Sequence, residues 1–251
     1  MSGVFDPELE LLPVLAANLK SKRAFDVGAN RGEFTAAMRS AGFSVDSFEP
    51  LPKLARLLHK RFAKDSQVCV HQLACSNSDG MTKLHKFSAL DSELDTTLFS
   101  TLSPHPAYEG LKSSHKIMVR TSRLDSMFPT ATKVGLLKID TEGHDIAVLK
   151  GAGDLHPEVI LVEFWDENFV FNAGKVSNRL QDFQGQINAD RYKHNILFWR
   201  RGNAEEYGII FDAAQSPSAT WGNIMFFDQE PVFENARKFL IEKYGATLAN
   251  Y

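Results

Sequence analysis

The stretch A-F-D-V-G-A-N-R-G-E-F-T, residues 24–35, decides the fold that the sequence predicts. Its first residues are apolar and β-prone, Gly28 and Gly32 predict a tight turn, and the apolar spacing from Phe34 onward predicts a helix. Glycine lets the backbone approach a ligand because it carries no Cβ. The first turn of a helix also presents unpaired N–H groups and a positive dipole end. The stretch therefore predicts a nucleotide-binding strand, turn and helix.

The spacing of the turn residues indicates which class of nucleotide they suit. A dinucleotide-binding turn reads G-x-G-x-x-G, whereas Asn30 here occupies the position of the middle glycine that admits a pyrophosphate. A second predicted strand, 43–49, ends in Glu49, whose carboxylate can accept hydrogen bonds from both hydroxyls of a ribose. These features favour a nucleoside without a bridging pyrophosphate, such as S-adenosyl-L-methionine. They disfavour an NAD-dependent oxidoreductase.

Five motifs in chain order are similar to those of one known family. They are D-V-G-A-N-R-G at 26–32, F-E-P at 48–50, L-A-C-S-N at 73–77, R-L-D-S at 123–126 and L-K-I-D-T-E-G-H at 137–144. Together they resemble the FkbM-type methyltransferases, which belong to class I of the S-adenosylmethionine-dependent methyltransferases. The resemblance implies an α/β fold with a doubly wound, mostly parallel, seven-stranded Rossmann-like sheet and helices on both faces. It also implies methyl transfer to a hydroxyl of a sugar, glycan or related metabolite.

The residue pattern and the resemblance together give the expected cofactor-binding residues. These are Asp26, Gly28, Asn30, Gly32, Glu49, Ala74 and Asp140. Ala74 is included because the resemblance implies that the end of the third strand, predicted at 67–74, contacts the adenine ring. Asp140 ends an apolar strand predicted at 134–140. Ligands of open α/β sheets bind beyond the carboxyl ends of the strands, so we expect Asp140 to face the methionine end of the cofactor.

A hydroxyl acceptor needs a nearby group that removes its proton. We expect the catalytic residues to be Asp140, Glu163 and His144, with Asp140 the first choice. Glu163 follows a second apolar run, 159–162, and His144 is the side chain whose usual pKa lies closest to neutral pH. In the alternative interpretation, His144 fixes its loop through a hydrogen bond. Lys138 lies on the same strand face as Asp140, and we expect it to form an ion pair with Asp140 or another local acid.

Two further features have more than one interpretation. Asp140, Glu142 and His144 could be taken for a cluster of metal ligands, but their pattern does not establish one, and we expect no metal. Asp125 is expected either to cap a short helix at 126–128 or to take part in catalysis.

The length of 251 residues suits a single α/β domain, 1–251. Residues 1–21 are predicted to form an N-terminal helical cap, and 88–116 an insertion or lid loop, since this stretch has little periodicity. The formal net charge of −3 argues against a nucleic-acid partner, which usually requires a basic surface. Because no apolar run reaches spanning length, we expect no contact with a membrane.

The chain contains two cysteines, Cys69 and Cys75, which are too few for a disulfide scaffold and have no second pair to complete a metal site. We expect both to behave as small hydrophobic residues in or just after a strand. A reducing cytoplasm is the expected compartment.

Two other functions stay open at the level of the sequence. One is a binding or scaffold protein that keeps the cofactor fold without turnover. The other is a nucleic-acid methyltransferase, which the net charge of −3 and the lack of an N-P-P-aromatic motif after the fourth strand disfavour. The sequence does not indicate which small-molecule or saccharide acceptor is used, which position is methylated or what the oligomeric state is.

Overall fold

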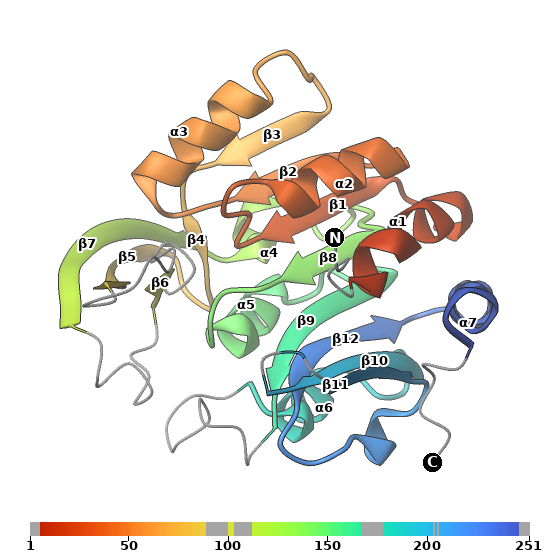
Figure 1. The fold of residues 1–251 in the computed structure, drawn as a ribbon. Helices are drawn as coiled ribbons and strands as arrows, with labels where there is room; N and C mark the ends of the chain where they lie inside the picture. The colour runs from red at the N-terminus through yellow and green to blue at the C-terminus, as the bar shows by residue number, and fades with distance from the viewer. Residues whose placement is uncertain are drawn as a thin grey trace, which may run out of the picture.

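The computed structural model describes residues 6–88, 100–102, 112–166, 178–202, 204 and 206–245. They form a large sheet with helices on both faces and a smaller second sheet (Figure 1). The lid loop predicted for 88–116 falls mainly on residues 89–99 and 103–111, which lie outside the described ranges. No helix of the described residues combines the length and the apolar composition needed to cross a membrane.

The large sheet has the strand order β11-β10-β12-β9-β8-β1-β2-β3. Its strands are β1 (Arg23–Val27), β2 (Ser44–Phe48), β3 (Val68–His71), β8 (Leu136–Ile139), β9 (Val159–Trp165), β10 (His194–Arg201), β11 (Glu206–Ile210) and β12 (Trp221–Phe227). Strands β3, β2, β1, β8 and β9 pair in parallel, and β12, β10 and β11 extend the sheet through antiparallel pairs. The predicted doubly wound, mostly parallel α/β class is confirmed. The described sheet has one strand more than the expected seven, because β11 pairs with the outer edge of β10.

Two sets of helices cover the large sheet. On one face lie α1 (Pro7–Asn18), α2 (Glu33–Ala41) and α7 (Glu230–Tyr244), and on the other lie α4 (Leu124–Met127), α5 (Asp145–Ala152) and α6 (Leu180–Gln186). Successive side chains of a strand point to opposite faces. In β1, Ala24 therefore packs with the first set of helices and Phe25 with the second. α3 (Pro52–Arg61) packs beside β3, and a short 3₁₀ helix, η4 (Ala213–Gln215), follows β11.

The second sheet has the strand order β4-β7-β5-β6 and lies near α3, beside the β3 edge of the large sheet (Figure 1). Its strands are β4 (Ala74–Cys75), β5 (Gly80–Ser88), β6 (Ser100–Thr101) and β7 (Lys112–Ser122). Leu84 of β5 and Val119 of β7 are buried in a small apolar cluster with Leu51 and Leu54. This sheet therefore places an apolar surface next to the start of α3.

The predicted third strand, 67–74, divides between the two sheets. β3 ends at His71 in the large sheet, and Ala74 begins β4 in the small one. The two cysteines differ as a result, because Cys69 on β3 is exposed and Cys75 on β4 is buried. The expectation that both are small hydrophobic residues is confirmed for Cys75 and is wrong for Cys69.

A buried ion pair joins α1 to the antiparallel part of the large sheet. Glu8 and Arg200 are 2% and 6% exposed, and their charged groups lie 3.1 Å apart. The Asn223 side chain donates a second hydrogen bond to the Glu8 carboxylate, at 2.7 Å. Burial raises the pKa of Glu8, and Arg200 opposes this shift. Because a buried charge is costly without its partner, this pair should matter more than a surface pair.

We expect Glu8→Ala to lower the free energy of unfolding by about 3–5 kcal/mol, since it leaves the Arg200 charge buried without its main partner. Urea denaturation would measure the loss. The matched control is Glu10→Ala on the same helix, where the ion pair with Lys243 spans 2.8 Å between side chains that are 42% and 45% exposed. That change should cost no more than about 1 kcal/mol. Equal losses in the two variants would contradict the assignment.

Candidate functional site

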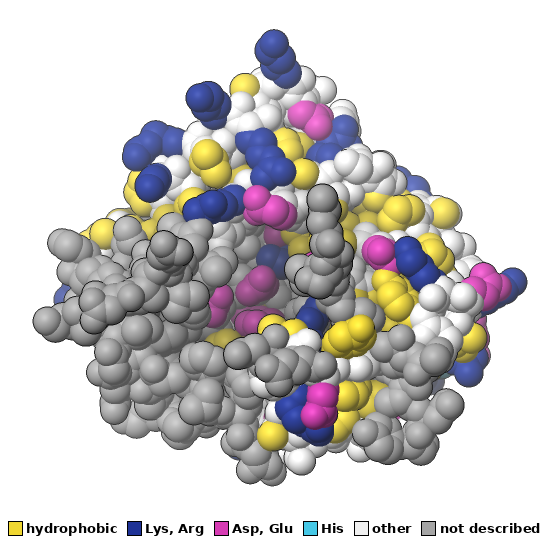
Figure 2. Space-filling view, viewed as in Figure 1, with side chains coloured by type: hydrophobic (Ala, Val, Ile, Leu, Met, Phe, Trp, Pro, Cys, Tyr) yellow, Lys and Arg dark blue, Asp and Glu magenta, His cyan; other side chains and the backbone are white. Residues whose placement is uncertain are grey.

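The carboxyl ends of β1, β2 and β8 border a cavity. This edge contains the topological switch point of the sheet, because β1 pairs with β2 on one side and with β8 on the other. The lining residues are Val27, Gly28, Asn30, Phe48, Glu49, Pro50, Leu51, Leu73, Ala74, Cys75, Leu84, Leu102, Asp140, Thr141, Glu142 and His144. Acidic side chains lie in the central hollow of the molecule, whereas Lys and Arg side chains gather over α3 (Figure 2).

The turn after β1 adopts left-handed backbone at its glycines and at Asn30. Gly28 has φ +78°, and Asn30 has φ +50°, a conformation that asparagine tolerates better than most residues. A Cβ on Gly28 would lie 1.9 Å from the Asp140 carbonyl oxygen. Position 28 therefore requires a glycine mainly because the segment after β8 packs closely against it. Gly28 also lines the cavity.

Gly32 has a different surrounding from the one that the sequence suggests. Its φ is +83°, and a Cβ there would lie 2.6 Å from the Leu58 side chain and 2.9 Å from that of Phe62. It stands at the start of α2 and is absent from the cavity lining. The close approach at Gly32 is thus made by side chains at and just after α3.

Glu49 is 5% exposed and is held in the cavity wall by two backbone donors. One carboxylate oxygen accepts the Asn30 N–H at 2.9 Å, and the other accepts the Leu51 N–H at 2.8 Å. Burial raises the pKa of Glu49 to about 7, although these two hydrogen bonds oppose the shift. The Asn30 side-chain oxygen is also buried and accepts no hydrogen bond from the described residues. Both side chains thus offer acceptor oxygens to a ligand with hydroxyl or ammonium groups.

Lys138 lies at the back of the same region, between two carboxylates. Its ammonium group lies 3.3 Å from Asp26 and 3.4 Å from Asp140, and it donates a hydrogen bond to the Gly28 carbonyl at 3.2 Å. Burial lowers the pKa of Lys138, but the two carboxylates outweigh burial and hold the pKa above its usual value. The predicted pair with Asp140 is confirmed. Asp26 is fully buried and outside the cavity lining, so it fixes the turn from behind.

A group of acidic residues follows β8 and includes Glu163 within β9. Asp140 and Glu142 line the cavity, and the Asp140 side chain is 44% exposed. Burial, followed by the negative charges of Asp140, Glu142 and Asp145, raises the pKa of Glu163 well above its usual value. One Glu163 oxygen is buried without a hydrogen bond from the described residues. Burial also raises the pKa of Asp145 to about 6, against the hydrogen bonds from Thr141. The structure therefore brings Asp140 and Glu163 into one electrostatic cluster.

His144 lines the cavity but is a poor base in this position. Burial lowers its pKa to about 4, so the imidazole is neutral at physiological pH. Its Nε2 lies 3.0 Å from the Ser76 hydroxyl. This is the hydrogen bond that the alternative interpretation predicts, and it argues against His144 as the proton acceptor. The sequence pattern could not reveal this, because Ser76 comes from a distant part of the chain.

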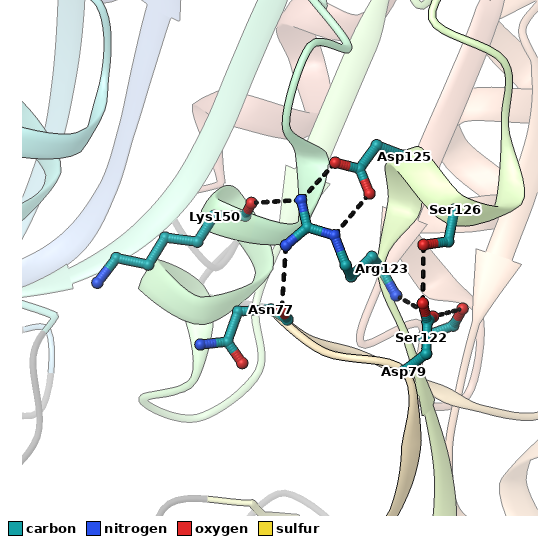
Figure 3. Close-up of polar contacts among 7 residues, drawn as sticks. All are labelled: Asn77, Asp79, Ser122, Arg123, Asp125, Ser126 and Lys150. Carbon is teal, nitrogen blue, oxygen red and sulfur yellow. Dashed lines mark hydrogen bonds and ion pairs between the residues drawn. The ribbon is translucent and has the colours of Figure 1, made fainter.

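A polar network fixes the segment that carries Ser76 (Figure 3). The Arg123 side chain donates to Asp125 at 2.7 Å, to the Asn77 carbonyl at 3.0 Å and to the Lys150 carbonyl at 3.3 Å. Asp79 accepts from the Ser122 hydroxyl, the Arg123 N–H and the Ser126 hydroxyl, at 2.6, 2.9 and 2.8 Å. These hydrogen bonds join the β4–β5 turn to β7, α4 and α5. Asp125 pairs with Arg123 and makes no side-chain cap on α4, so the expected capping role is wrong.

Sequence reasoning missed much of the apolar lining of the cavity. Leu51, Leu84 and Leu102 all line it, and two of them come from the small sheet and the segment after β6. Alternation along β5 could have indicated that Leu84 is buried. No local pattern shows that the small sheet folds over the cofactor edge of the large one.

The fold and the cavity at the switch point define a class I S-adenosylmethionine-dependent methyltransferase. The Methyltransferase FkbM domain family matches residues 26–186, and the chain belongs to this family. "Methyltransferase 1" of Beauveria bassiana (strain ARSEF 2860) is 28% identical over 167 residues, which cover 60% of this chain and 67% of that protein. The structure of a putative O-methyltransferase from Klebsiella pneumoniae is similar in fold, with a TM-score of 0.50 and 12% identity over 91% of this chain and 83% of that one.

We expect Glu49→Gln to weaken binding of S-adenosylhomocysteine, the demethylated cofactor, by about 10- to 100-fold, because a charged acceptor contributes about 1.5–3 kcal/mol. In the wild type, affinity should fall as the pH drops through about 7, since Glu49 then gains a proton. Calorimetric titration across this pH range would measure both effects.

The matched control for this test is Glu33→Gln, an exposed carboxylate at the start of α2 that is absent from the cavity lining. It should leave the affinity unchanged. A Glu49→Gln variant that binds as tightly as the wild type, with the same pH dependence, would exclude Glu49 from cofactor binding.

Proposed function

We propose that this chain transfers the methyl group of S-adenosyl-L-methionine to a hydroxyl oxygen of a sugar, glycan or related metabolite. The observation that carries the proposal is that Asp140 and Glu142 line the cavity, and that their charges and that of Asp145 act on the buried carboxyl of Glu163. A hydroxyl group is a weak nucleophile until a base takes its proton. Carboxylates also accept hydrogen bonds from neighbouring hydroxyls, which suits a polyhydroxylated acceptor.

The cavity residues fit the cofactor at three points. Glu49 offers its carboxylate to the ribose hydroxyls, and the unsatisfied Asn30 side-chain oxygen offers a further acceptor. Ala74 and Leu84 provide an apolar wall for the adenine ring. When bound, the cofactor supplies a methyl group that is already activated on a sulfonium. Gly28 and Gly32 contribute to the site by shaping the turn and the start of α2, and Asp26 by holding Lys138.

We assign proton removal to Glu163 and positioning of the acceptor hydroxyl to Asp140. Burial and neighbouring carboxylates raise the pKa of Glu163, which makes its carboxylate a stronger base than an exposed one. Asp140 is more exposed and is anchored by Lys138 next to Gly28. His144 stays neutral and orients the loop through Ser76. This order differs from the sequence-based preference for Asp140 as the base.

The charge distribution supports a small or saccharide acceptor over a nucleic acid. The carboxyls at the cavity would repel a phosphate backbone, and the chain has a net charge of −3. We propose the cytoplasm as the compartment, a choice supported by the two free thiols of Cys69 and Cys75.

We expect Glu163→Gln to lower kcat by about 10²–10⁴-fold while leaving the affinity for S-adenosylhomocysteine close to that of the wild type, since it removes the base alone. Asp140→Asn should lower kcat and raise the KM for the acceptor. Steady-state kinetics with a methyl-labelled cofactor would measure these parameters. Glu234→Gln, an exposed substitution on α7, serves as the matched control. Wild-type kcat in Glu163→Gln would remove Glu163 from the mechanism.

We expect His144→Asn to lower kcat by about tenfold or less, because an Asn side chain can keep a hydrogen bond to Ser76 while losing the ability to take a proton near neutral pH. A loss as large as that of Glu163→Gln, together with a changed pH–rate profile, would instead make His144 the base.

The acceptor class is tested by incubating the wild type with labelled cofactor and two pools, one of neutral saccharides and glycosylated metabolites and one of RNA and DNA. Label should enter the saccharide pool in alkali-stable ether linkage. Label in the nucleic-acid pool alone, or on nitrogen alone, would overturn the proposal.

A further inference from the structure

We propose that Asp46, Cys69 and His71 form a binding site for Zn²⁺ that is separate from the cofactor cavity. Asp46 lies on β2, and Cys69 and His71 lie on β3, the edge strand of the large sheet. One potential ligand atom from each side chain lies within 4.8 Å of the other two. None of the three residues lines the cavity. The site is therefore a feature of the sheet edge that methyl transfer does not use.

Strand register explains why three residues so far apart in the chain share one place. Asp46 is directly opposite Cys69 in the parallel β2–β3 pair. Cys69 and His71 are two positions apart on β3, so their side chains point to the same face of the sheet. The Nε2 atom of His71 also lies 2.9 Å from one Asp46 oxygen. The backbone thus brings the three side chains together before any ion binds.

The chemistry of this set matches zinc. Thiolate sulfur, imidazole nitrogen and carboxylate oxygen are its three protein ligand types, and three such ligands plus a water make an open tetrahedral site. Zinc–ligand bonds of about 2.0–2.3 Å place neighbouring ligand atoms about 3.3–3.7 Å apart. The exposed Cys69 side chain needs to move by only about 1 Å to reach this spacing. Its thiol releases a proton to solvent as the Zn–S bond forms. The proton that His71 Nε2 donates to Asp46 moves by way of solvent to Nδ1, so that Nε2 and the Asp46 oxygen bind the ion in place of their hydrogen bond.

Neighbouring groups hold two of the ligands in position. Arg23 donates to the second Asp46 oxygen at 2.9 Å, which leaves the oxygen that faces His71 for the ion. The His71 ring stacks on Phe48, with centroids 4.7 Å apart and planes at 14°. Partners of this kind orient metal ligands. The Asp46 carboxylate and the Cys69 thiolate together offset the two charges of Zn²⁺, while the Arg23 charge opposes binding and favours a micromolar rather than a nanomolar affinity.

The bound ion would join β2 to the edge strand β3. The His71 carbonyl accepts the N–H of Glu49 at 3.1 Å and that of Leu73 at 3.0 Å, so this strand end also supports the cofactor cavity. An ion that binds the folded chain preferentially raises its thermal stability. Zinc should therefore raise the Tm of the wild type.

The test is a titration of the metal-free, full-length protein with ZnCl₂ in competition with a chromophoric chelator. The wild type should bind one equivalent with micromolar affinity. Cys69→Ser and His71→Asn should each weaken binding by about tenfold or more and lower the zinc-dependent rise in Tm accordingly. The matched control is His59→Asn, an exposed histidine on α3 outside the cluster, which should leave binding unchanged.

Substitution with Co²⁺ gives a readout that a merely destabilised variant would not mimic. The wild type should show a thiolate-to-cobalt charge-transfer band that Cys69→Ser lacks, with circular dichroism confirming that the variant is folded. The exposed Cys69 position keeps this arm valid even if His71→Asn, which loses the stacking on Phe48, fails to fold. The proposal would be overturned if the wild type failed to bind one equivalent of zinc, or if Cys69→Ser and the wild type bound zinc with equal affinity.

Discussion

The buried ammonium group of Lys138 is the constraint on which the cofactor edge of this protein depends. It reaches from β8 to Asp26 on β1 and to Asp140, and it also binds the Gly28 carbonyl. The Asp26 carboxylate in turn accepts the hydroxyl hydrogen bond of Thr35 on α2, at 2.6 Å. Because a buried charge loses more by desolvation than it gains from a distant partner, these groups must stay close. One cation thereby locks the turn after β1 to the segment after β8.

The polar and the apolar residues that line the cavity contribute to it in different ways. Among the polar groups, burial raises the pKa of Glu49 and of Glu163, and for Glu163 the charges of Asp140 and Glu142 add to the shift. Among the apolar groups, Leu84 and Leu102 exclude water without offering hydrogen bonds. Such a mixed lining suits a ligand that carries both a flat apolar ring and charged groups. The pKa values of the carboxyls therefore depend on how deeply the small sheet and the strand ends bury them.

The sequence motifs contribute to the site in unequal ways. Glu49 and Asp140 line the cavity as their positions at strand ends predict. Arg123 and Asp125 instead join the small sheet to α4 and α5, and they hold the segment that places Ser76 beside His144. A motif can therefore be needed for the site without touching the ligands. Sequence spacing cannot separate these roles, because both require polar residues just after a strand.

The sequence by itself determined the strand, turn and helix at 24–35, the α/β class and the acidic residues that end the central strands, since periodicity and turn chemistry are local properties. Only the tertiary structure decided that Gly32 faces α3, that His144 is neutral and that Cys69 lies beside Asp46. Each of these depends on what packs against a residue from a distant part of the chain. Desolvation, close approach and strand register are properties of that packing, and no local pattern contains them.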